Sequence, residues 1–502
     1  MSVSMFWLAG VWLLQVVTDR IQKNPLKARF SRFAENRNAL LLTSFFILPI
    51  LGLLWTEDFG YASWDLRMKI PMLFMPFVLT TLNPISGKEY RALLGIFLLS
   101  LTFAVLWCLL IFWGVNEKEY QDVREISVFI SHVRFSLLLI MGIFILLHEA
   151  WTKEYGKILT TILTILFLYF IYVIGSMTGM IVLFIATLYM LIGYLKKEGN
   201  KKHKILGVAI VSLLSITTII YAQKRYHAYF NVDPAILQRL EKTTRLGEVY
   251  EHNLSYPVVE DGHYVMTHIA WGEMYSAWLE RSNINPDSLD GRGHVLKGTL
   301  IRYLASKGLY KDSDGIAALN EQDVHAIETG VTGIHEGKKS GLHKRLDNIF
   351  FELANYRAGG TPNGHSVFQR LEFWRTASHI IRANALIGVG TGDVKTAFHS
   401  AYEEMKSPLE SQYRLRAHNQ YLTIWLTYGI IGLIWFLIIL IAPFIYDQKK
   451  KPLLAIFLII ASMSFLTEDT LESQAGVMFV VFFYMFFSLK KTASLSEFRV
   501  AK

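Results

Sequence analysis

Long apolar segments separated by short polar stretches run through most of the chain. Apolar runs of roughly 15–27 residues recur, and a helix of that length can cross the hydrocarbon core of a bilayer. About eleven such spans are expected, near residues 3–17, 39–55, 68–82, 91–114, 126–148, 157–175, 177–195, 205–222, 420–446, 453–466 and 473–489. The pattern therefore predicts an all-α polytopic membrane protein with about 11–12 transmembrane helices.

One long polar segment interrupts this pattern between residues 223 and 417. At about 195 residues it is long enough to fold as a mainly helical module with its own core. The predicted organisation is a transmembrane bundle of about eight spans over 1–222, a loop domain over 223–417, about three spans over 418–489 and a tail over 490–502.

Composition agrees with a membrane protein. The 502 residues are 52% hydrophobic and only 18% charged, and the mean hydropathy is +0.33. A soluble domain seldom combines these values. The single cysteine, Cys108, falls inside a predicted span, so no disulfide can frame the polar module.

Basic residues cluster at a few places that would share one side of the membrane. They gather in 18–38, 196–204, 449–451 and 490–491. By the positive-inside rule that side is the cytoplasm, so the polar module and the turn at 467–472 face outward and the C-terminus faces inward. Basic loops of this kind are topology signals, which makes nucleic-acid binding a poor interpretation. The marginal first span leaves the orientation of the N-terminus open.

Three basic residues stand directly before the span at 420–446, namely Arg414, Arg416 and His418. The outward start of that helix carries the positive end of its dipole, and such a place attracts a phosphate or diphosphate. Positive surroundings should keep the imidazole neutral and able to accept a proton. The alternative for a lone histidine here is a helix cap or an interfacial anchor. Deeper in the span, Gly429 and Gly432 should let another helix approach closely.

Other polar groups lie beside predicted spans. His132 and Arg134 lie near the entrance of the span at 126–148, as interfacial anchors or as anion ligands. Ser176, in a very short junction between two spans, can cap the second one. The outer turn at 467–472 carries Glu468 and two further carboxylates, which suit metal binding, base catalysis or pairing with arginines. Pairing is favoured because no histidine accompanies them at ligand spacing.

The end of the polar module has helical period over 370–388. Arg375 falls on one face, and another, apolar face can be shared by Leu371, Trp374, Ala377, Ile381 and Ala385. The sequence GVGTGD at 388–393 has the glycine density of a nucleotide loop, but it lacks the preceding strand and the lysine of a P-loop. A turn that positions two helices is the favoured interpretation.

These motifs together resemble a known family. The pattern of His418, Asn419, Gly429 and Gly432 is similar to the signature of the O-antigen ligase and O-antigen polymerase family of bacterial membrane glycosyltransferases. The block before it adds residues that match the family's core motif, namely Arg370, Trp374, Gly388, Gly390 and Tyr402. The resemblance is most specific across 370–432. The stretches 299–315 and 363–374 resemble a ligase-like subgroup with an enlarged outer loop.

The resemblance implies a GT-C-like, metal-independent glycosyltransferase of the bacterial inner membrane, with its loop domain in the periplasm and no cofactor. Its donor would be a glycan on undecaprenyl diphosphate, and its other contacts would be membrane lipids. The favoured acceptor is a hydroxyl of a lipid A–core sugar. The alternatives are another glycan, as in a polymerase, or a protein. A lipid-linked sugar transporter is disfavoured, because charge gathers at the outer mouth and no internal repeat is visible.

The resemblance also implies roles for residues. His418 corresponds to the acceptor-side base, and Arg370 to a diphosphate ligand. The expected donor-binding groups are Arg134, Arg416, Arg414, His132 and Arg375. Further candidates are Asn419, Tyr402, Glu468 and Ser176. The chain departs from many members at Met177, where they carry a diphosphate-binding arginine.

Overall fold

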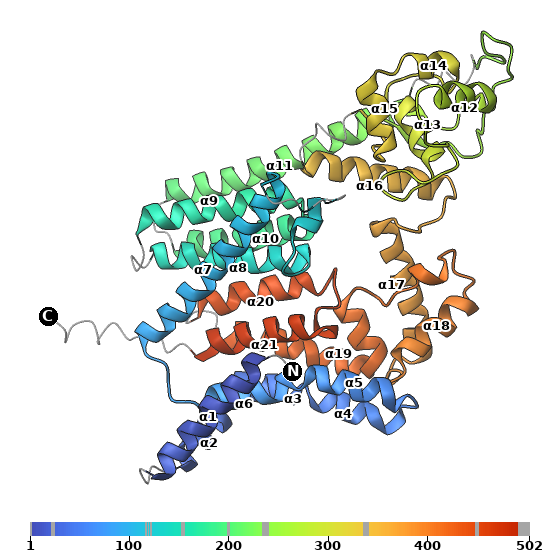
Figure 1. Cartoon of the computed structure of the whole chain (residues 1–502). Helices are drawn as coiled ribbons and strands as arrows, with labels where there is room; N and C mark the ends of the chain where they lie inside the picture. Colours follow the sequence, from blue (N-terminus) through green and yellow to red (C-terminus); the bar gives the residue numbers. More distant parts are fainter. Residues whose placement is uncertain are drawn as a thin grey trace.

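The computed structural model confirms the predicted fold class, an all-α polytopic membrane protein (Figure 1). It describes residues 3–21, 26–115, 118, 120, 123–151, 156–197, 201–232, 240–334, 341–446 and 451–489. The predicted tail at 490–502 lies outside these residues. Within them the strands form one two-stranded antiparallel sheet, β1 (Val259–Glu260) with β2 (His263–Tyr264).

The helices before the polar module begin at the N-terminus with a group of short elements. They are α1 (Val3–Ile21), α2 (Leu26–Glu35), α3 (Arg37–Ser44), α4 (Ile47–Leu51), η1 (Gly52–Trp55), α5 (Phe59–Lys69) and α6 (Pro71–Thr81). Longer helices follow: α7 (Gly87–Phe112), η2 (Val123–Ile126), α8 (His132–Trp151), α9 (Lys157–Ile174), α10 (Met177–Lys197) and α11 (Lys201–Phe230).

The polar module and the last membrane helices complete the described chain. The module contains α12 (Trp271–Leu279), α13 (Leu296–Ser306), α14 (Ser313–Ala317), α15 (Glu321–Glu328), α16 (Gly341–Arg357), α17 (Ser366–Ala383), α18 (Val394–Glu404) and η4 (Ser411–Tyr413). After it come α19 (Gln420–Tyr446), α20 (Pro452–Ser464), η5 (Thr470–Glu472) and α21 (Gln474–Leu489).

Five stretches of the described residues are long and apolar enough to cross a membrane. They are Arg37–Trp55, Gly87–Phe112, His132–Ala150, Lys157–Ile174 and Gln420–Tyr446. Shorter apolar helices lie at Met177–Gly193, Pro452–Ser464 and Gln474–Leu489. The total of about eleven spans stays a prediction.

Some boundaries differ from the expected ones. The span expected at 68–82 is the short helix α6, which starts anew at Pro71 because proline has no backbone N–H to continue α5. Helix α8 begins at His132 instead of residue 126, because Val123–Ile126 forms a separate 3₁₀ turn. Helix α11 continues to Phe230, across the expected domain boundary at 222.

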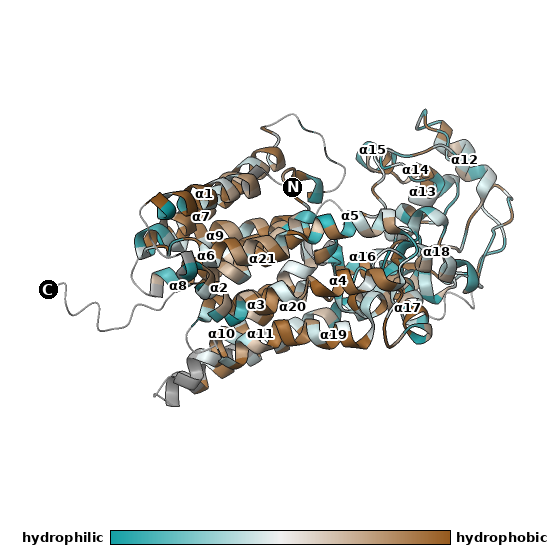
Figure 2. Ribbon diagram, turned by 90° about the horizontal axis from the view of Figure 1, so that it is seen from below, coloured by the Kyte–Doolittle hydropathy of each residue, from teal (hydrophilic) through white to brown (hydrophobic). Residues whose placement is uncertain are grey.

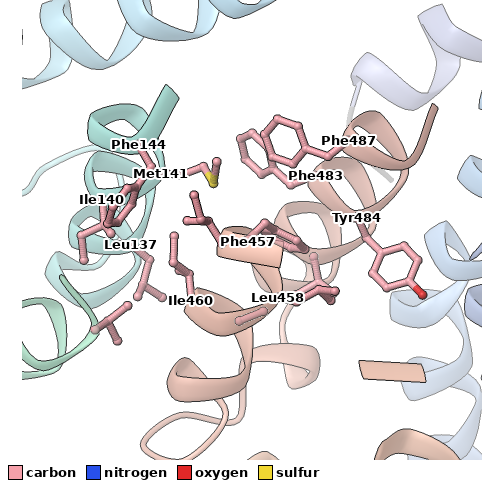
Figure 3. Close-up of a cluster of buried hydrophobic side chains, with 14 of the residues drawn as sticks. Leu137, Ile140, Met141, Phe144, Phe457, Leu458, Ile460, Phe483, Tyr484 and Phe487 are labelled. Carbon is pink, nitrogen blue, oxygen red and sulfur yellow. The ribbon is translucent and has the colours of Figure 1, made fainter. Parts of the chain in front are cut away.

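The largest hydrophobic core lies among α7, α8, α9, α10, α20 and α21. Figure 3 shows Phe457 of α20 and Phe483 of α21 facing Met141 and Phe144 of α8. The Phe457 and Phe483 ring centroids are 5.8 Å apart. Lipid is as apolar as these side chains, so close packing rather than escape from water must hold such helices together.

The polar module has a hydrophobic core of its own around Trp278, with residues from α12, α13 and α15. Figure 2 shows that polar residues are frequent over this module, whereas apolar colours dominate the membrane helices. A third cluster joins α17 and α18 to α19 through Phe373, Phe398 and Leu426. The end of the module is therefore packed directly onto a membrane helix.

Helix α19 is interrupted at Gly429, whose φ of 68° and ψ of −172° are not helical. The loop between α17 and α18 pairs with the backbone groups at the break. Val389 N donates to Leu426 O at 2.8 Å, Gly390 N donates to Thr427 O at 3.0 Å, and Ile430 N donates to Ala385 O at 2.9 Å. The GVGTGD stretch is thus a turn that joins helices, as its sequence favoured.

The expectation that Gly429 and Gly432 admit another helix is wrong. A Cβ at Gly429 would lie 2.0 Å from Leu386 O, so the group that approaches is the backbone of this loop. A Cβ at Gly432 would meet the side chain of Tyr428 in its own helix at 2.4 Å. Gly429 leaves room for the backbone of this loop, and Gly432 leaves room for the Tyr428 side chain beside the break in α19.

We expect Gly429→Ala to destabilise the protein. An alanine with this positive φ costs about 1–2 kcal/mol, and its methyl group would also clash with Leu386 O. The melting temperature of detergent-solubilised protein measures the effect. Gly193→Ala in α10 is the matched control, because nothing lies within 4 Å of the added carbon. Equal melting temperatures for the two variants would contradict the proposed contact.

Candidate functional site

Asp469, in the turn between α20 and α21, ties that turn to the start of α19. Its carboxylate accepts hydrogen bonds from the backbone N–H groups of His418 and Asn419, each at 3.0 Å, and from Thr423 Oγ1 at 2.7 Å. His418 adopts a φ of 45°, a conformation uncommon outside glycine. These three bonds fix the backbone that presents the imidazole.

Asn419, a candidate from the sequence, is a cap for α19. Its Oδ1 accepts hydrogen bonds from Tyr421 N at 3.0 Å and Leu422 N at 3.2 Å, and its Nδ2 donates to Leu466 O at 3.2 Å. An asparagine side chain in this position satisfies backbone N–H groups of the first helical turn. Asn419 therefore holds the helix start against the same turn that Asp469 holds.

Glu468 lies between the two residues that the sequence singled out as catalytic. Its Oε1 accepts a hydrogen bond from Arg370 Nη2 at 3.2 Å, and its Oε2 lies 3.8 Å from His418 Nδ1. Burial raises the pKa of this carboxyl, but His418, Arg370 and Arg134 lower it more, so it lies below its usual 4.5. The cluster thus unites α17, the segment before α19 and the turn after α20.

Two nitrogens of this cluster are buried and have no hydrogen-bond partner in the described part of the chain, Arg370 Nε and His418 Nδ1. Arg370 Nη1 donates to Ser366 O at 3.2 Å. The His418 side chain is 34% exposed and lies against Phe373, with ring centroids 5.6 Å apart. Buried polar atoms are nearly always paired, so the unpaired Arg370 Nε makes this cluster a candidate binding site.

Arg416 belongs to a second group of charges beside the first. Its Nη1 donates to Glu472 Oε2 at 3.0 Å and to Tyr61 OH at 2.8 Å. Burial lowers the pKa of Arg416, but Glu472, Tyr61 and Asp469 together raise it above its usual value, so the guanidinium stays charged. Glu472 also lies 3.4 Å from Lys69 Nζ, and Lys69 in turn pairs with Asp65 at 2.7 Å.

The sequence analysis missed Lys69 and Asp65. Both are fully buried on α5 and stand four residues apart, the spacing at which helical side chains meet. An ionisable pair directly before the apolar run that starts at Pro71 was the available signal. Their partner Glu472 lies about 400 residues away in sequence, and neither composition nor spacing reveals such a contact.

Arg134 lies on α8 at a pocket of about 260 Å³ between α8 and α21. The lining is mainly apolar and comprises Ile130, Arg134, Leu137, Leu138, Thr470, Ala475, Gly476, Met478, Phe479, Phe482 and Phe483. Thr470 belongs to the same turn as Glu468, and the charge of Arg134 contributes to the lowered pKa of Glu468. The apolar pocket therefore adjoins the charged cluster. His132 is the first residue of α8.

Two of the expected donor-binding arginines contact neighbouring side chains of the polar module. Arg414 donates to Leu409 O at 2.8 Å, pairs with Glu403 and lies over the Tyr402 ring. The Tyr402 hydroxyl is held by Leu415 O at 2.7 Å. Arg375 is 66% exposed, 3.8 Å from Glu372 of its own helix.

Two further expectations concern helices. Ser176 caps α10, as its position suggested, because its Oγ accepts a hydrogen bond from Gly179 N at 3.1 Å. The apolar face expected for 370–388 is confirmed at Ala377 and Ile381, which are buried, but is wrong at Leu371, which is 42% exposed. Phe373, outside the expected face, is buried as well. Helix α17 packs against both α18 and α19, which extends its buried side beyond the one that hydrophobicity alone suggested.

No group of three or more histidine, cysteine, aspartate and glutamate side chains is placed to hold a metal ion among the described residues. The charged groups that converge at the site are guanidinium, carboxylate and imidazole. Such a set can bind an anion through the arginines and exchange a proton at the histidine.

Residues 340–437 match a family model described as O-antigen ligase. This segment of the chain is similar to the O-antigen ligase family. This confirms the resemblance found from the sequence. The matched range includes Arg370 and His418 of the candidate site, while Arg134 and Glu468 lie outside it.

A curated protein described as uncharacterized, from Haemophilus influenzae (strain ATCC 51907 / DSM 11121 / KW20 / Rd), is 26% identical over 127 residues. The aligned segment covers 25% of this chain and 31% of the relative. The match thus spans about a third of the relative's length.

We expect Glu468→Gln to destabilise the protein at pH 7 by about 1–3 kcal/mol, the cost of leaving partly buried polar partners without the carboxylate. Because the folded-state pKa of Glu468 lies below 4.5, the carboxylate stabilises the fold above that pH. This contribution is lost as the pH falls through the lowered pKa. Melting temperatures of wild type and variant should therefore converge in acid.

The control variant is Glu410→Gln, since Glu410 is exposed and contacts Gln412. We expect its melting temperature to equal that of the wild type at every pH. A Glu468→Gln gap that stays constant or widens on acidification would contradict this electrostatic account.

Proposed function

We propose that this protein is a metal-independent, GT-C-like glycosyltransferase that moves a glycan from undecaprenyl diphosphate to an acceptor hydroxyl. The favoured acceptor is a lipid A–core sugar at the periplasmic face of the bacterial inner membrane. The observation that carries the proposal is the cluster in which Glu468 contacts both Arg370 and His418, beside an apolar pocket. The family description as O-antigen ligase favours this chemistry.

The donor would bind where charge and apolar surface adjoin. The pocket between α8 and α21 suits part of a polyprenyl chain, because nearly all its lining residues are apolar. Arg134 at that pocket and Arg370 beyond it would hold the diphosphate, and Arg416 would add a third positive charge nearby. Fixed guanidinium groups stabilise the negative charge that grows on a leaving diphosphate. Arg134 would then supply the diphosphate-binding charge that many family members have at the position of Met177.

His418 would act as the base. The acceptor hydroxyl gives its proton to the imidazole while its oxygen bonds to the anomeric carbon of the donor glycan. The bond from that carbon to the diphosphate oxygen breaks, and undecaprenyl diphosphate leaves with the electron pair. Glu468 faces Nδ1, so the opposite nitrogen is the one offered to the acceptor, and the carboxylate would stabilise the protonated ring.

The proposed sidedness follows from the basic loops. If lysine- and arginine-rich segments lie in the cytoplasm, the start of α19 and the turn after α20 face the periplasm. The polar module would then cover the sugar-binding side of the cluster. Lipid-linked glycans presented at that face could meet an acceptor without leaving the membrane surface.

We expect His418→Asn to lower the rate of glycan transfer at least about 100-fold, the contribution typical of a general base. Asparagine tolerates the positive φ at this position, so the backbone is spared. The assay uses purified protein in liposomes with lipid-linked glycan and lipid A–core, without metal or nucleotide, and the product is separated on a gel.

His379→Asn is the matched control, since His379 is a partly exposed histidine of α17 paired with Glu404. Near-normal transfer by the His418 variant would reject the base assignment. A ladder of products in place of single transfer would identify a polymerase instead of a ligase.

We expect Arg134→Ala to raise the KM for the lipid-linked donor at least about tenfold, since a charge-assisted bond to phosphate contributes roughly 1.5–3 kcal/mol. The KM for the acceptor should not change. Arg245→Ala, which removes an exposed arginine of the polar module, should leave both constants unaltered. If Arg134→Ala changed only the acceptor KM, Arg134 would contact the acceptor, and its assignment to the donor diphosphate would be wrong.

A further inference from the structure

The loop between α17 and α18 carries two large apolar side chains on its surface. Leu386 is 71% exposed and Ile387 is 54% exposed. The sequence analysis treated this stretch as the end of a helix in a polar loop domain. An exposed apolar pair that adjoins further exposed apolar surface marks a place where a partner or a membrane covers the protein.

The loop is bound to α19 well inside that helix. Its backbone pairs with Leu426, Thr427 and Ile430, and Ala385 O also accepts a hydrogen bond from Trp425 Nε1 at 3.2 Å. Thr427 stands seven residues from the first residue of α19, which corresponds to about 10 Å along the helix. Helix α19 has 27 residues, about 40 Å, against a hydrocarbon core of roughly 30 Å. If the excess is shared between its ends, Thr427 still lies about 5 Å inside the core.

A second membrane stretch places the loop at a similar depth. Thr391 Oγ1 donates to Pro49 O at 2.7 Å, and Pro49 lies six residues before the end of the candidate span Arg37–Trp55. Asp393, just after the loop, accepts hydrogen bonds from Glu57 N and Asp58 N beyond the end of that span. The chain therefore dips below the end of the span at Thr391 and returns by Asp393.

The surfaces on both sides of the loop face outward and are apolar. On α19, Ile431 and Ile434 are 65% and 52% exposed, and they follow directly after the break at Gly429. On the other side, Leu54 is 79% exposed and Ile50 is 48% exposed. Figures 1 and 2 both show the end of α17 beside α4 and α19. The loop thus lies between two stretches that are apolar enough to contact lipid.

Non-helical backbone is tolerated at membrane depth only where its polar groups are satisfied. The bonds to Leu426, Thr427 and Ala385 meet this need at the break in α19, and Gly388 N donates to Asn384 O within the loop at 2.9 Å. One turn earlier, Arg382 is exposed in the last turn of α17, where a long basic side chain can reach lipid phosphates.

We propose that residues 384–390 form a re-entrant loop whose tip, Leu386 and Ile387, inserts into the acyl chains of the lipid bilayer beside α19. Its partner is the lipid hydrocarbon itself. The polar module is then anchored in the membrane at the end of α17 as well as by the helices that flank it.

Single-cysteine labelling tests this insertion. Cys108 is fully buried, so the wild-type protein serves as the unlabelled control. Leu386→Cys, Ile387→Cys and Lys395→Cys are each labelled with an environment-sensitive thiol-reactive fluorophore and reconstituted in phosphatidylcholine vesicles. Lys395 is an exposed residue of α18, five positions after the loop. Quenching is measured with brominated acyl chains and with iodide on both sides of the vesicles.

The fluorophores at 386 and 387 should be quenched by brominated chains at least twofold more than the one at 395, and iodide should give the reverse order. Equal iodide quenching at all three positions would overturn the proposal, since the tip would then lie in water. Resistance of 386 and 387 to both quenchers would overturn it as well, because protein would then cover the tip. The two neighbouring positions give independent results if one variant folds poorly.

Discussion

The carboxylate of Asp469 accepts hydrogen bonds from the backbone N–H groups of His418 and Asn419, and the rest of the site depends on this interaction. Burial of a charge is costly unless hydrogen bonds offset it, and Thr423 supplies a third bond. Burial still raises the pKa of Asp469, against the opposing charge of Arg416 and the bond from Thr423. The result is a rigid connection between the turn after α20 and the first turn of α19.

This connection explains why histidine and glutamate meet. Glu468 precedes Asp469 in the same turn, so fixing one residue fixes the direction of the other. The positive φ of His418 then turns its ring toward Glu468 and Phe373. The site is assembled from α17, the start of α19 and the turn between α20 and α21. The hydrogen bonds of Asp469 to backbone groups fix how that turn lies against α19.

The balance of charge is the second property of the site. The sequence suggested a patch of unopposed cations at the mouth of a helix. In the structure Arg370 pairs with Glu468, and Arg416 pairs with Glu472, so these two cations already have carboxylate partners. An anion that binds here must compete with these internal partners, and its departure restores them. Such pairing keeps partly buried arginines charged and ordered without a ligand.

The sequence by itself determined the fold class and the resemblance to the O-antigen ligase family, because apolar periodicity and a short motif are local properties of the chain. It also selected Arg370, His418 and Glu468, and it favoured pairing over metal binding for the carboxylates. The direction of α17 was only partly predictable, since Leu371 and Phe373 are both apolar and packing alone decides between them.

Only the tertiary structure decided which groups meet. Arg370 and Glu468 stand 98 positions apart, and Lys69 pairs with Glu472 from the far end of the chain. Such contacts depend on how helices pack, which leaves no trace in the spacing of residues. The role of Gly429 is of the same kind: sequence shows a small residue in a span, but its interrupted helix and its pairing with residues 385–390 arise from the approach of a distant loop.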